Sequence, residues 1–231
     1  MIFKRIVFFG SIQSAKNCLK IVCKNLEFQK IIIVTETRKK KYFYVRKYAK
    51  KNKLMFVSYN YFENNFNNQK FDLGISIRYN NIIKEQLIKR FKFGIINLHG
   101  GELPFYRGTS NHIFAIINNE KKFGVSLHFI NKKIDSGRIL AVRKFKIDKK
   151  FTGYALLKRT FSNGEVLLNN FTKNLAKMKK FPKGKFNNIK KEKEYKQKDL
   201  DDLKKNLKLI KNKEILNLTK RALYHPNKNE I

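Results

Sequence analysis

The chain has 231 residues, of which 42% are hydrophobic, and its 53 Lys and Arg against 17 Asp and Glu give a formal net charge of +36. This hydrophobic share is near the globular average, which excludes a wholly disordered chain, and the length predicts one main domain with an appendage. A membrane span of about 20 apolar residues and a disulfide scaffold are also excluded, because the apolar runs are short and only Cys18 and Cys23 are present. We expect no secretory signal and a reducing, cytoplasmic setting.

Short apolar runs alternate with helix-like segments in the first hundred residues. The predicted strands are 3–9, 31–34, 54–57, 71–77 and 94–98, and the predicted helices are 12–26, 38–51 and 82–91. The Asn-rich stretch 60–70 fits neither pattern clearly and is left open. Strands alternating with helices are typical of βαβ units, so we predict an α/β fold with a Rossmann-like, mostly parallel sheet flanked by helices.

The second half of the chain has a different order of predicted elements, and its last part has a different composition. The pattern predicts a helix at 110–118, strands at 125–130 and 138–147, and a long helix at 152–178. From Lys179 onward lysine is dense and apolar residues become fewer. We therefore predict a main domain at 1–178 and a short basic C-terminal extension at 179–231, with a helix around 200–218.

The positive charge comes mostly from lysine, with 43 Lys against 10 Arg. Arginine is the residue suited to bidentate recognition of phosphates and bases, so the charge alone does not predict a nucleic-acid surface. Compositional drift from an AT-rich coding sequence and a surface evolved for anions both remain open. Either way, the charge should attract anionic ligands in a salt-dependent manner.

Polar residues with catalytic chemistry gather after the predicted strand 94–98. Asn97 and His99 are two residues apart on a strand, so their side chains share one face at the end of the sheet where ligands of parallel sheets bind. Both can donate a hydrogen bond to a developing oxyanion, and His99 can also move a proton. A carboxylate from a distant loop, such as Asp135, would orient that imidazole and raise its pKa. Since no Ser or Cys lies in a recognisable nucleophile elbow, direct transfer without a covalent enzyme intermediate is the simpler hypothesis.

Four motifs in a fixed order resemble the folate-dependent formyltransferase family, which includes glycinamide ribonucleotide, methionyl-tRNA and sugar-nucleotide N-formyltransferases. The motifs are Asn97-Leu-His99, the segment 103–108, the segment 124–128 and the segment 134–137. The opening segment 5–11 is also similar to the family's first strand and turn, and the resemblance covers about residues 1–175. The chain departs from the family pattern at 100–102, where Gly-Gly-Glu replaces the usual Ser or Pro-Ser.

The resemblance implies a catalytic domain at 1–178 with the formyltransferase fold, and an enzyme that moves a formyl group from 10-formyltetrahydrofolate to an amine. The family's catalytic residues match Asn97, His99 and Asp135. The residues expected to bind the folate co-substrate are Arg78, Tyr79, Asn80, Ile82, Ile83, Lys133 and Ile134. The residues expected near the acceptor are Gly10, Ser11, Arg107 and Gly108. We expect Arg107 mainly to hold the shape of its loop. We expect His128 to be mainly a hydrogen-bonded structural histidine. No metal site is expected.

The acceptor is predicted from the C-terminal part of the chain. Segments 195–203 and 220–226 look similar to the closing segment of sugar-nucleotide N-formyltransferases, whereas the tRNA enzyme carries a sizeable second domain. We therefore expect a nucleotide-linked amino sugar as acceptor, as in cell-surface polysaccharide synthesis. The alternative is a methionyl-tRNA formyltransferase-like enzyme, the only reading that requires a nucleic acid partner. A basic binding module without turnover is the non-enzymatic reading, and a homodimer is expected from the family.

Overall fold

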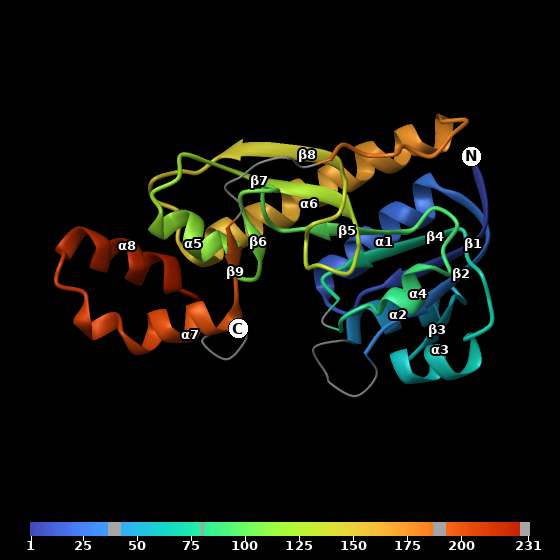
Figure 1. The fold of residues 1–231 in the computed structure, drawn as a ribbon, viewed down its shortest axis with the longest axis horizontal. Coiled ribbons are helices and arrows are strands. Elements are labelled where there is room, and N and C mark those ends of the chain that lie inside the picture. Colours follow the sequence, from blue (N-terminus) through green and yellow to red (C-terminus); the bar gives the residue numbers. More distant parts are fainter. Residues whose placement is uncertain (37–42, 80, 187–192, 227–231) are drawn as a thin grey trace.

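The computed structural model describes residues 1–36, 43–79, 81–186 and 193–226. Its main feature is a seven-stranded sheet with the order β3-β2-β1-β4-β5-β7-β8 (Figure 1). These strands are Ile2–Phe9 (β1), Glu27–Val34 (β2), Met55–Val57 (β3), Leu73–Ile77 (β4), Ile95–His99 (β5), Lys122–Phe129 (β7) and Ile139–Lys146 (β8). The pairs among β1 to β5 are parallel, and β7 and β8 add two antiparallel pairs. The predicted α/β fold with a mostly parallel sheet is confirmed.

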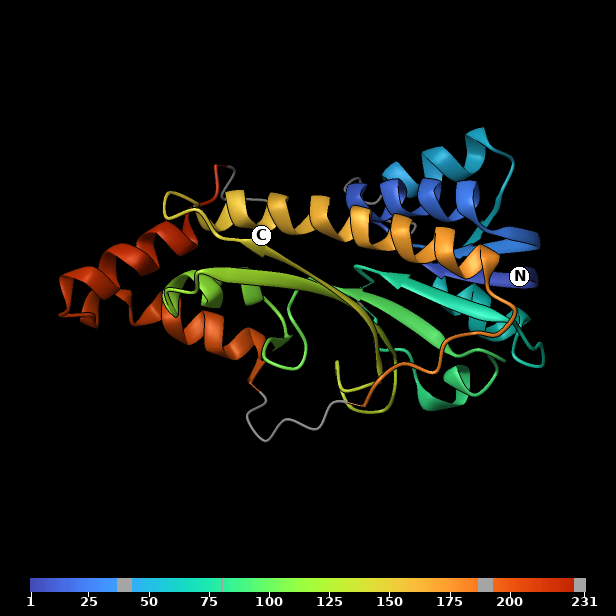
Figure 2. The same cartoon turned by 90° about the horizontal axis from the view of Figure 1, so that it is seen from above.

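Helices cover both faces of the sheet because its central strands are apolar on both sides. One core joins the sheet to α1 (Gln13–Asn25), α2 (Phe43–Lys51) and α6 (Gly153–Lys177). The core on the other face includes residues of α3 (Tyr59–Asn65) and α4 (Glu85–Ile88). In Figure 2, α1 and α6 run side by side along one face of the sheet. None of the helices in the described ranges is long and apolar enough to cross a membrane.

In the first half of the chain, one stretch left open proves helical and one predicted helix is shorter than expected. The open stretch 60–70 contains α3, whose start is fixed by Ser58, because its hydroxyl accepts a hydrogen bond from the Tyr61 N–H at 3.2 Å. The helix expected at 82–91 is limited to α4, since Lys84 is still extended and Ile82 is 79% exposed. An exposed isoleucine contributes no buried face that would hold a longer helix.

The segment 193–226 packs against α5 (Asn111–Ile117), α6 and β7, next to β6 (Arg107–Gly108), which lies outside the main sheet. Its first strand, β9 (Glu194–Tyr195), pairs in parallel with β6. The helix expected at 200–218 is instead two helices, α7 (Gln197–Lys205) and α8 (Lys213–Leu223), separated by a 3₁₀ turn. The break occurs because the side chain of Asn212 caps α8, accepting hydrogen bonds from the N–H groups of Glu214 and Ile215. The domain division at residue 178 stays a prediction.

Candidate active site

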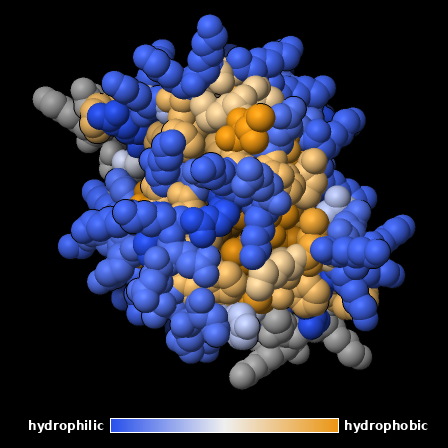
Figure 3. Space-filling model, turned by 90° about the vertical axis from the view of Figure 1, so that its right-hand side faces the viewer, coloured by the Kyte–Doolittle hydropathy of each residue, from blue (hydrophilic) through white to orange (hydrophobic). Residues whose placement is uncertain are grey.

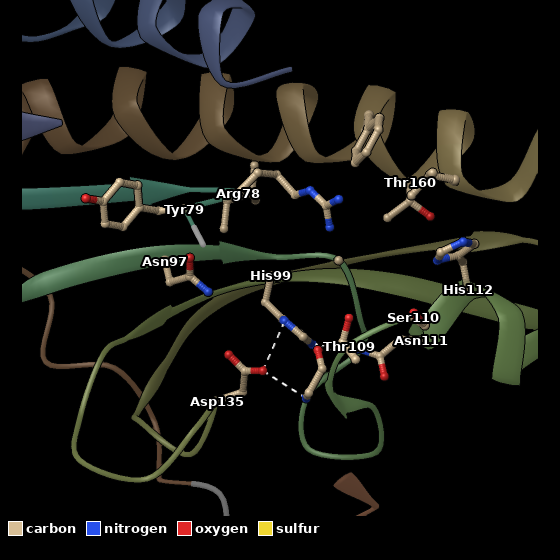
Figure 4. Close-up of a pocket in the computed structure, with 15 residues that line it drawn as sticks. Arg78, Tyr79, Asn97, His99, Thr109, Ser110, Asn111, His112, Asp135 and Thr160 are labelled. Carbon is tan, nitrogen blue, oxygen red and sulfur yellow. Dashed lines mark hydrogen bonds and ion pairs between the residues drawn. The ribbon is translucent and has the colours of Figure 1, made fainter. Parts of the chain in front are cut away.

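The carboxyl end of β5 places Asn97 and His99 side by side, as their spacing predicts. In the antiparallel register of β5 and β7, Asn97 lies opposite His128 and His99 lies opposite Ser126. His99 is 7% exposed and His128 is 1% exposed, so both imidazoles are held within the protein. A cavity of about 190 Å³ opens beside them, lined by the ends of β4 and β5, the loop before α5, and α6 (Figure 4). That volume is below the roughly 300–1,000 Å³ typical of a pocket that encloses a whole ligand.

Asp135 reaches this cavity from the turn between β7 and β8. Its Oδ2 lies 3.4 Å from His99 Nδ1 and accepts a hydrogen bond from the Gly108 N–H at 2.9 Å (Figure 4). Its Oδ1 lies 3.4 Å from His128 Nε2. Three segments far apart in the sequence are therefore joined by one carboxylate. The structure brings together the three side chains that the sequence motifs singled out.

The surroundings of Asp135 keep its carboxylate ionised. Burial raises its pKa, but His99, His128 and the Gly108 N–H together lower the pKa of Asp135 to about 2. These positive or donating groups act at short range, where water screens them poorly. At neutral pH the pocket therefore holds a fixed negative charge next to His99.

His99 carries a hydrogen on Nε2, because that nitrogen lies 2.6 Å from the carbonyl oxygen of Tyr106, which can only accept. Burial lowers the pKa of His99, while Asp135 acts in the opposite direction. A neutral His99 with hydrogen on Nε2 leaves Nδ1 facing the carboxylate. When a proton arrives at Nδ1, Asp135 is placed to stabilise the resulting imidazolium. The pair can thus hold one additional proton.

His128 orients the amide of Asn97. Its Nδ1 lies 2.8 Å from the carbonyl oxygen of Phe129 and donates there, while its Nε2 faces the Asp135 carboxylate at 3.4 Å. Asn97 Nδ2 lies 3.1 Å from the same Nε2, so the imidazole holds the amide next to Asp135. This matches the interpretation of His128 as a hydrogen-bonded structural histidine.

The loop after His99 explains the Gly-Gly-Glu sequence at 100–102. A Cβ on Gly101 would lie 2.5 Å from the Tyr106 carbonyl oxygen and 2.7 Å from His99 Nε2. A glycine therefore lets the loop fold closely over the imidazole. Glu102 continues the loop outward and pairs with Lys144 at 2.6 Å.

The expected folate residues are only partly gathered at the cavity. Arg78 and Tyr79 line it. Ile83 is 7% exposed and belongs to the core under α3 and α4, whereas Ile82 and Ile134 are largely exposed. Lys133 is also exposed. Asn80 lies outside the described residues.

The expected acceptor residues fall into two groups. Gly108 lines the cavity, whereas Gly10 and Ser11 do not, and the Ser11 hydroxyl accepts a hydrogen bond from the Glu36 N–H at 3.0 Å. Arg107 is 2% exposed, and its guanidinium donates to the Ile134 carbonyl at 3.0 Å and pairs with Glu194 at 3.2 Å. The positive charge of Arg107 is therefore paired within the protein, as expected for a residue that holds the shape of its loop.

Several cavity residues have no role in the sequence prediction. The loop before α5 contributes Thr109 and Ser110, the start of α5 contributes Asn111 and His112, and α6 contributes Leu157, Thr160 and Phe161. The residues of the first group directly follow the 103–108 motif, so their position in the sequence could have predicted that they lie near the cavity. The α6 residues gave no signal, because only packing places that helix over the cavity.

Comparison with known proteins shows one family across most of the chain. The Formyl transferase family matches residues 4–171. The bifunctional polymyxin resistance protein ArnA of Wigglesworthia glossinidia brevipalpis is 42% identical over 98 residues, 42% of this chain and 15% of that protein. A methionyl-tRNA formyltransferase of Finegoldia magna is 34% identical over 98 residues, 42% of this chain and 32% of that protein. A GDP-perosamine N-formyltransferase of Brucella melitensis is 33% identical over 97 residues, 42% of this chain and 38% of that protein. The matched stretches thus span less than two fifths of these relatives' lengths.

Solved structures extend the similarity beyond those stretches. An N-formyltransferase from Helicobacter canadensis, in complex with folinic acid and dTDP-3-aminofucose, is 25% identical with a TM-score of 0.67. That match covers 86% of this chain and 72% of the other. A 4-N formyltransferase from Francisella tularensis, 18% identical, has the same fold over 96% of this chain and 89% of its own, with a TM-score of 0.76. A glycinamide ribonucleotide transformylase from Symbiobacterium toebii, 14% identical, covers 76% of this chain and 88% of its own, with a TM-score of 0.64.

Proposed function

The chain belongs to the formyl transferase family, and from this membership we propose that it transfers a formyl group from 10-formyltetrahydrofolate to the amino group of a nucleotide-linked amino sugar. The observation that carries the reaction class is the contact of His99 with Asp135 at 3.4 Å, next to Asn97 at the end of β5. An amide donor, an imidazole and a carboxylate are the groups that transfer of an acyl carbon to an amine requires.

A folate co-substrate fits the chemistry of the residues that line the cavity. It supplies the formyl group to be transferred. Tyr79 offers an aromatic wall beside Asn97, and the loop that carries Asp135 closes the opposite side. We assign the folate to these two segments, with Ile82, Ile83, Lys133 and Ile134 beside them.

The three side chains then have distinct roles. Asn97 donates a hydrogen bond to the formyl oxygen, where negative charge develops as the acceptor amine attacks the formyl carbon. His99 takes the proton that the amine loses as the new C–N bond forms, and Asp135 stabilises the charged imidazole. The same proton is returned to the leaving nitrogen as the old C–N bond breaks, so no external acid or base is required.

The C-terminal segment supports a sugar acceptor over the purine precursor. The 4-N formyltransferase fold matches 96% of this chain, whereas the glycinamide ribonucleotide transformylase fold matches 76%. The Helicobacter enzyme, 25% identical, has dTDP-3-aminofucose in its complex. The fold comparison and this ligand both favour an amino sugar linked to a nucleotide.

Methionyl-tRNA formylation is the second candidate, and a specific observation favours it. A methionyl-tRNA formyltransferase is 34% identical over 98 residues, about as similar as the GDP-perosamine enzyme. The charge of +36 would attract tRNA phosphates. Nucleic acid is a partner only under this candidate, and a homodimer stays a prediction under both.

The test is to incubate the protein with 10-formyltetrahydrofolate and a panel of dTDP- and GDP-linked amino sugars, with charged initiator tRNA in parallel. We expect folate-dependent formylation of at least one sugar, detected by mass spectrometry. Formylation of the tRNA alone would replace the first candidate by the second. Formylation of neither would favour a binding module.

The role of His99 is tested with the variant His99→Asn, which removes the group that moves the proton. We expect turnover to fall by about 10²–10³-fold, a typical contribution for one such group. Asp148→Asn is a suitable control, because Asp148 is exposed and only contacts its own loop. Full turnover in His99→Asn with an unchanged unfolding midpoint would contradict the assigned role.

A further inference from the structure

Arg78 projects into the cavity without an ionic partner. It follows β4, and its side chain is exposed to the cavity, with the guanidinium 5.3 Å from the ring centre of Phe161 on α6. Across the described ranges, neither a carboxylate nor a hydrogen-bond acceptor contacts that guanidinium. Figure 4 shows it directed along the cavity, between α6 and β5. Because arginine remains charged at all physiological pH values, the cavity contains a positive charge with no direct ion pair in the described ranges.

The backbone at Arg78 is held in an uncommon conformation. Its φ of +51° lies in the left-handed region, which costs a non-glycine residue free energy. Ser110 and Asp135, with φ of +55° and +48°, also line the cavity. Strained residues of this kind concentrate at ligand sites, and Asp135 already belongs to the proposed machinery. Arg78 is thus held in place by the fold at a point where it contacts no protein charge.

The described residues near Arg78 include an uncharged histidine and no carboxylate that is free to pair with it. His112, at the start of α5, lines the same cavity and has no hydrogen-bond partner within the described part of the chain. Burial lowers the pKa of His112 to about 3, and Arg78 and His225 add to that effect by repulsion. Among the described residues that line the cavity, the one carboxylate is Asp135, which is engaged by His99, His128 and Gly108. An anionic ligand would give Arg78 the direct ion pair that the described lining residues do not provide.

We propose that Arg78, assisted by His112, binds a phosphate group of the acceptor. This inference rests on the proposed function and specifies how the nucleotide-linked acceptor is recognised. A guanidinium presents paired N–H donors that match two phosphate oxygens, and His112 adds a neutral N–H. Thr109 and Ser110 line the same cavity and offer two further hydroxyl donors.

The position of Arg78 separates it from the side assigned to folate. The guanidinium of Arg78 extends toward α6, in the direction opposite to the Tyr79 ring and away from Asp135 and its loop. The guanidinium therefore faces the acceptor side of the cavity. This assignment replaces the sequence-based expectation that Arg78 binds the folate.

The experiment measures binding rather than turnover, so that it does not depend on formyl transfer. Isothermal titration calorimetry with inorganic pyrophosphate, dTDP and 5-formyltetrahydrofolate is carried out on the wild type and on Arg78→Asn. Asparagine adopts the left-handed region more readily than most residues, so this variant should keep its fold, as its unfolding midpoint would verify. We expect its affinity for pyrophosphate and dTDP to fall by about 10- to 100-fold, as for loss of a charged hydrogen bond, with unchanged affinity for folate.

Two further variants sharpen the test. Arg159→Gln removes the same charge from an exposed position on α6 that does not line the cavity, and it should leave all affinities unchanged. His112→Asn should weaken phosphate binding severalfold. Equal affinities in Arg78→Asn and the wild type would overturn the proposal, as would absence of phosphate binding in the wild type or a loss confined to folate. Arg78-dependent binding of dTDP without formylation of any sugar would support the phosphate site and reject the proposed reaction.

Discussion

At the scale of single residues, Asp135 connects more of the site than any other side chain described above. It contacts His99, His128 and the backbone of Gly108, and so joins β5, β7 and β6. Its carboxylate is 12% exposed, which keeps these interactions strong. Asp135 should therefore affect both stability and turnover.

The pH dependence of unfolding tests this role. The pKa of Asp135 is about 2 in the folded protein, against about 3.9 for an unfolded Asp, so its stabilising effect is present above pH 4 and is lost as the pH falls toward 2. This difference corresponds to about 2 to 3 kcal/mol. In urea unfolding, Asp135→Asn should be less stable than the wild type at pH 6, and the gap should narrow at pH 2.5.

The exposed Asp148→Asn serves as the control for that measurement. Its unfolding free energy should follow that of the wild type across the same pH range. A gap for Asp135→Asn that stays constant with pH would mean that its carboxylate is not stabilised by the folded protein.

At the scale of elements, the pairing of β6 with β9 links the C-terminal segment to the site. The N–H of Gly108 in β6 donates to Asp135, and Tyr195 in β9 stacks on Phe114 of α5 with ring centres 4.0 Å apart. The Tyr195 hydroxyl also accepts a hydrogen bond from Asn118 at 2.9 Å. The segment after residue 193 thus supports the loop that orients the candidate catalytic carboxylate.

Gly108→Ala tests this link. The glycine has a φ of +82°, and an added Cβ would lie 2.0 Å from the Tyr195 carbonyl oxygen. Strand β9 would have to move, so we expect a loss of more than about 1 kcal/mol of stability, together with reduced turnover. The control is Gly100→Ala, whose Cβ would make an ordinary contact of 3.4 Å with Thr160. Equal unfolding midpoints for the two variants would show that β6 and β9 are not closely paired.

At the scale of the whole molecule, the net charge of +36 affects both the stability of the fold and the attraction of anions. On the face shown in Figure 3, hydrophilic side chains project outward and apolar surface lies between them. Like charges spread over a surface repel one another and destabilise the compact state. The same field raises the local concentration of anionic substrates.

Salt should therefore stabilise this protein. Raising sodium chloride from about 20 to 300 mM shortens the screening length several-fold, and we expect the melting temperature to rise as repulsion weakens. Differential scanning fluorimetry measures this shift, and sucrose at equal osmolality controls for solute effects. A melting temperature that is constant or falls with salt would show that the lysines are already neutralised by their surroundings.

The sequence by itself determined the α/β alternation and three candidate catalytic residues. Strands and helices could be predicted because the apolar repeats of β1, β4, β5 and α6 are local properties of the chain. Asn97 and His99 could be placed together because residues two apart on a strand share a face. Asp135 could be identified only through the ordered motifs, since nothing local connects it to His99.

The tertiary structure decided the rest of the site. It placed α6 over the cavity, directed Arg107 inward to Glu194, and left Arg78 beside His112 without a carboxylate. It also divided the C-terminal helix in two and brought β9 to β6. These features depend on which faces pack together after the chain has folded. The periodicity of the sequence predicts which face of a helix or strand is apolar. It does not predict which other element that face packs against, because this depends on how the side chains of the whole molecule fit together.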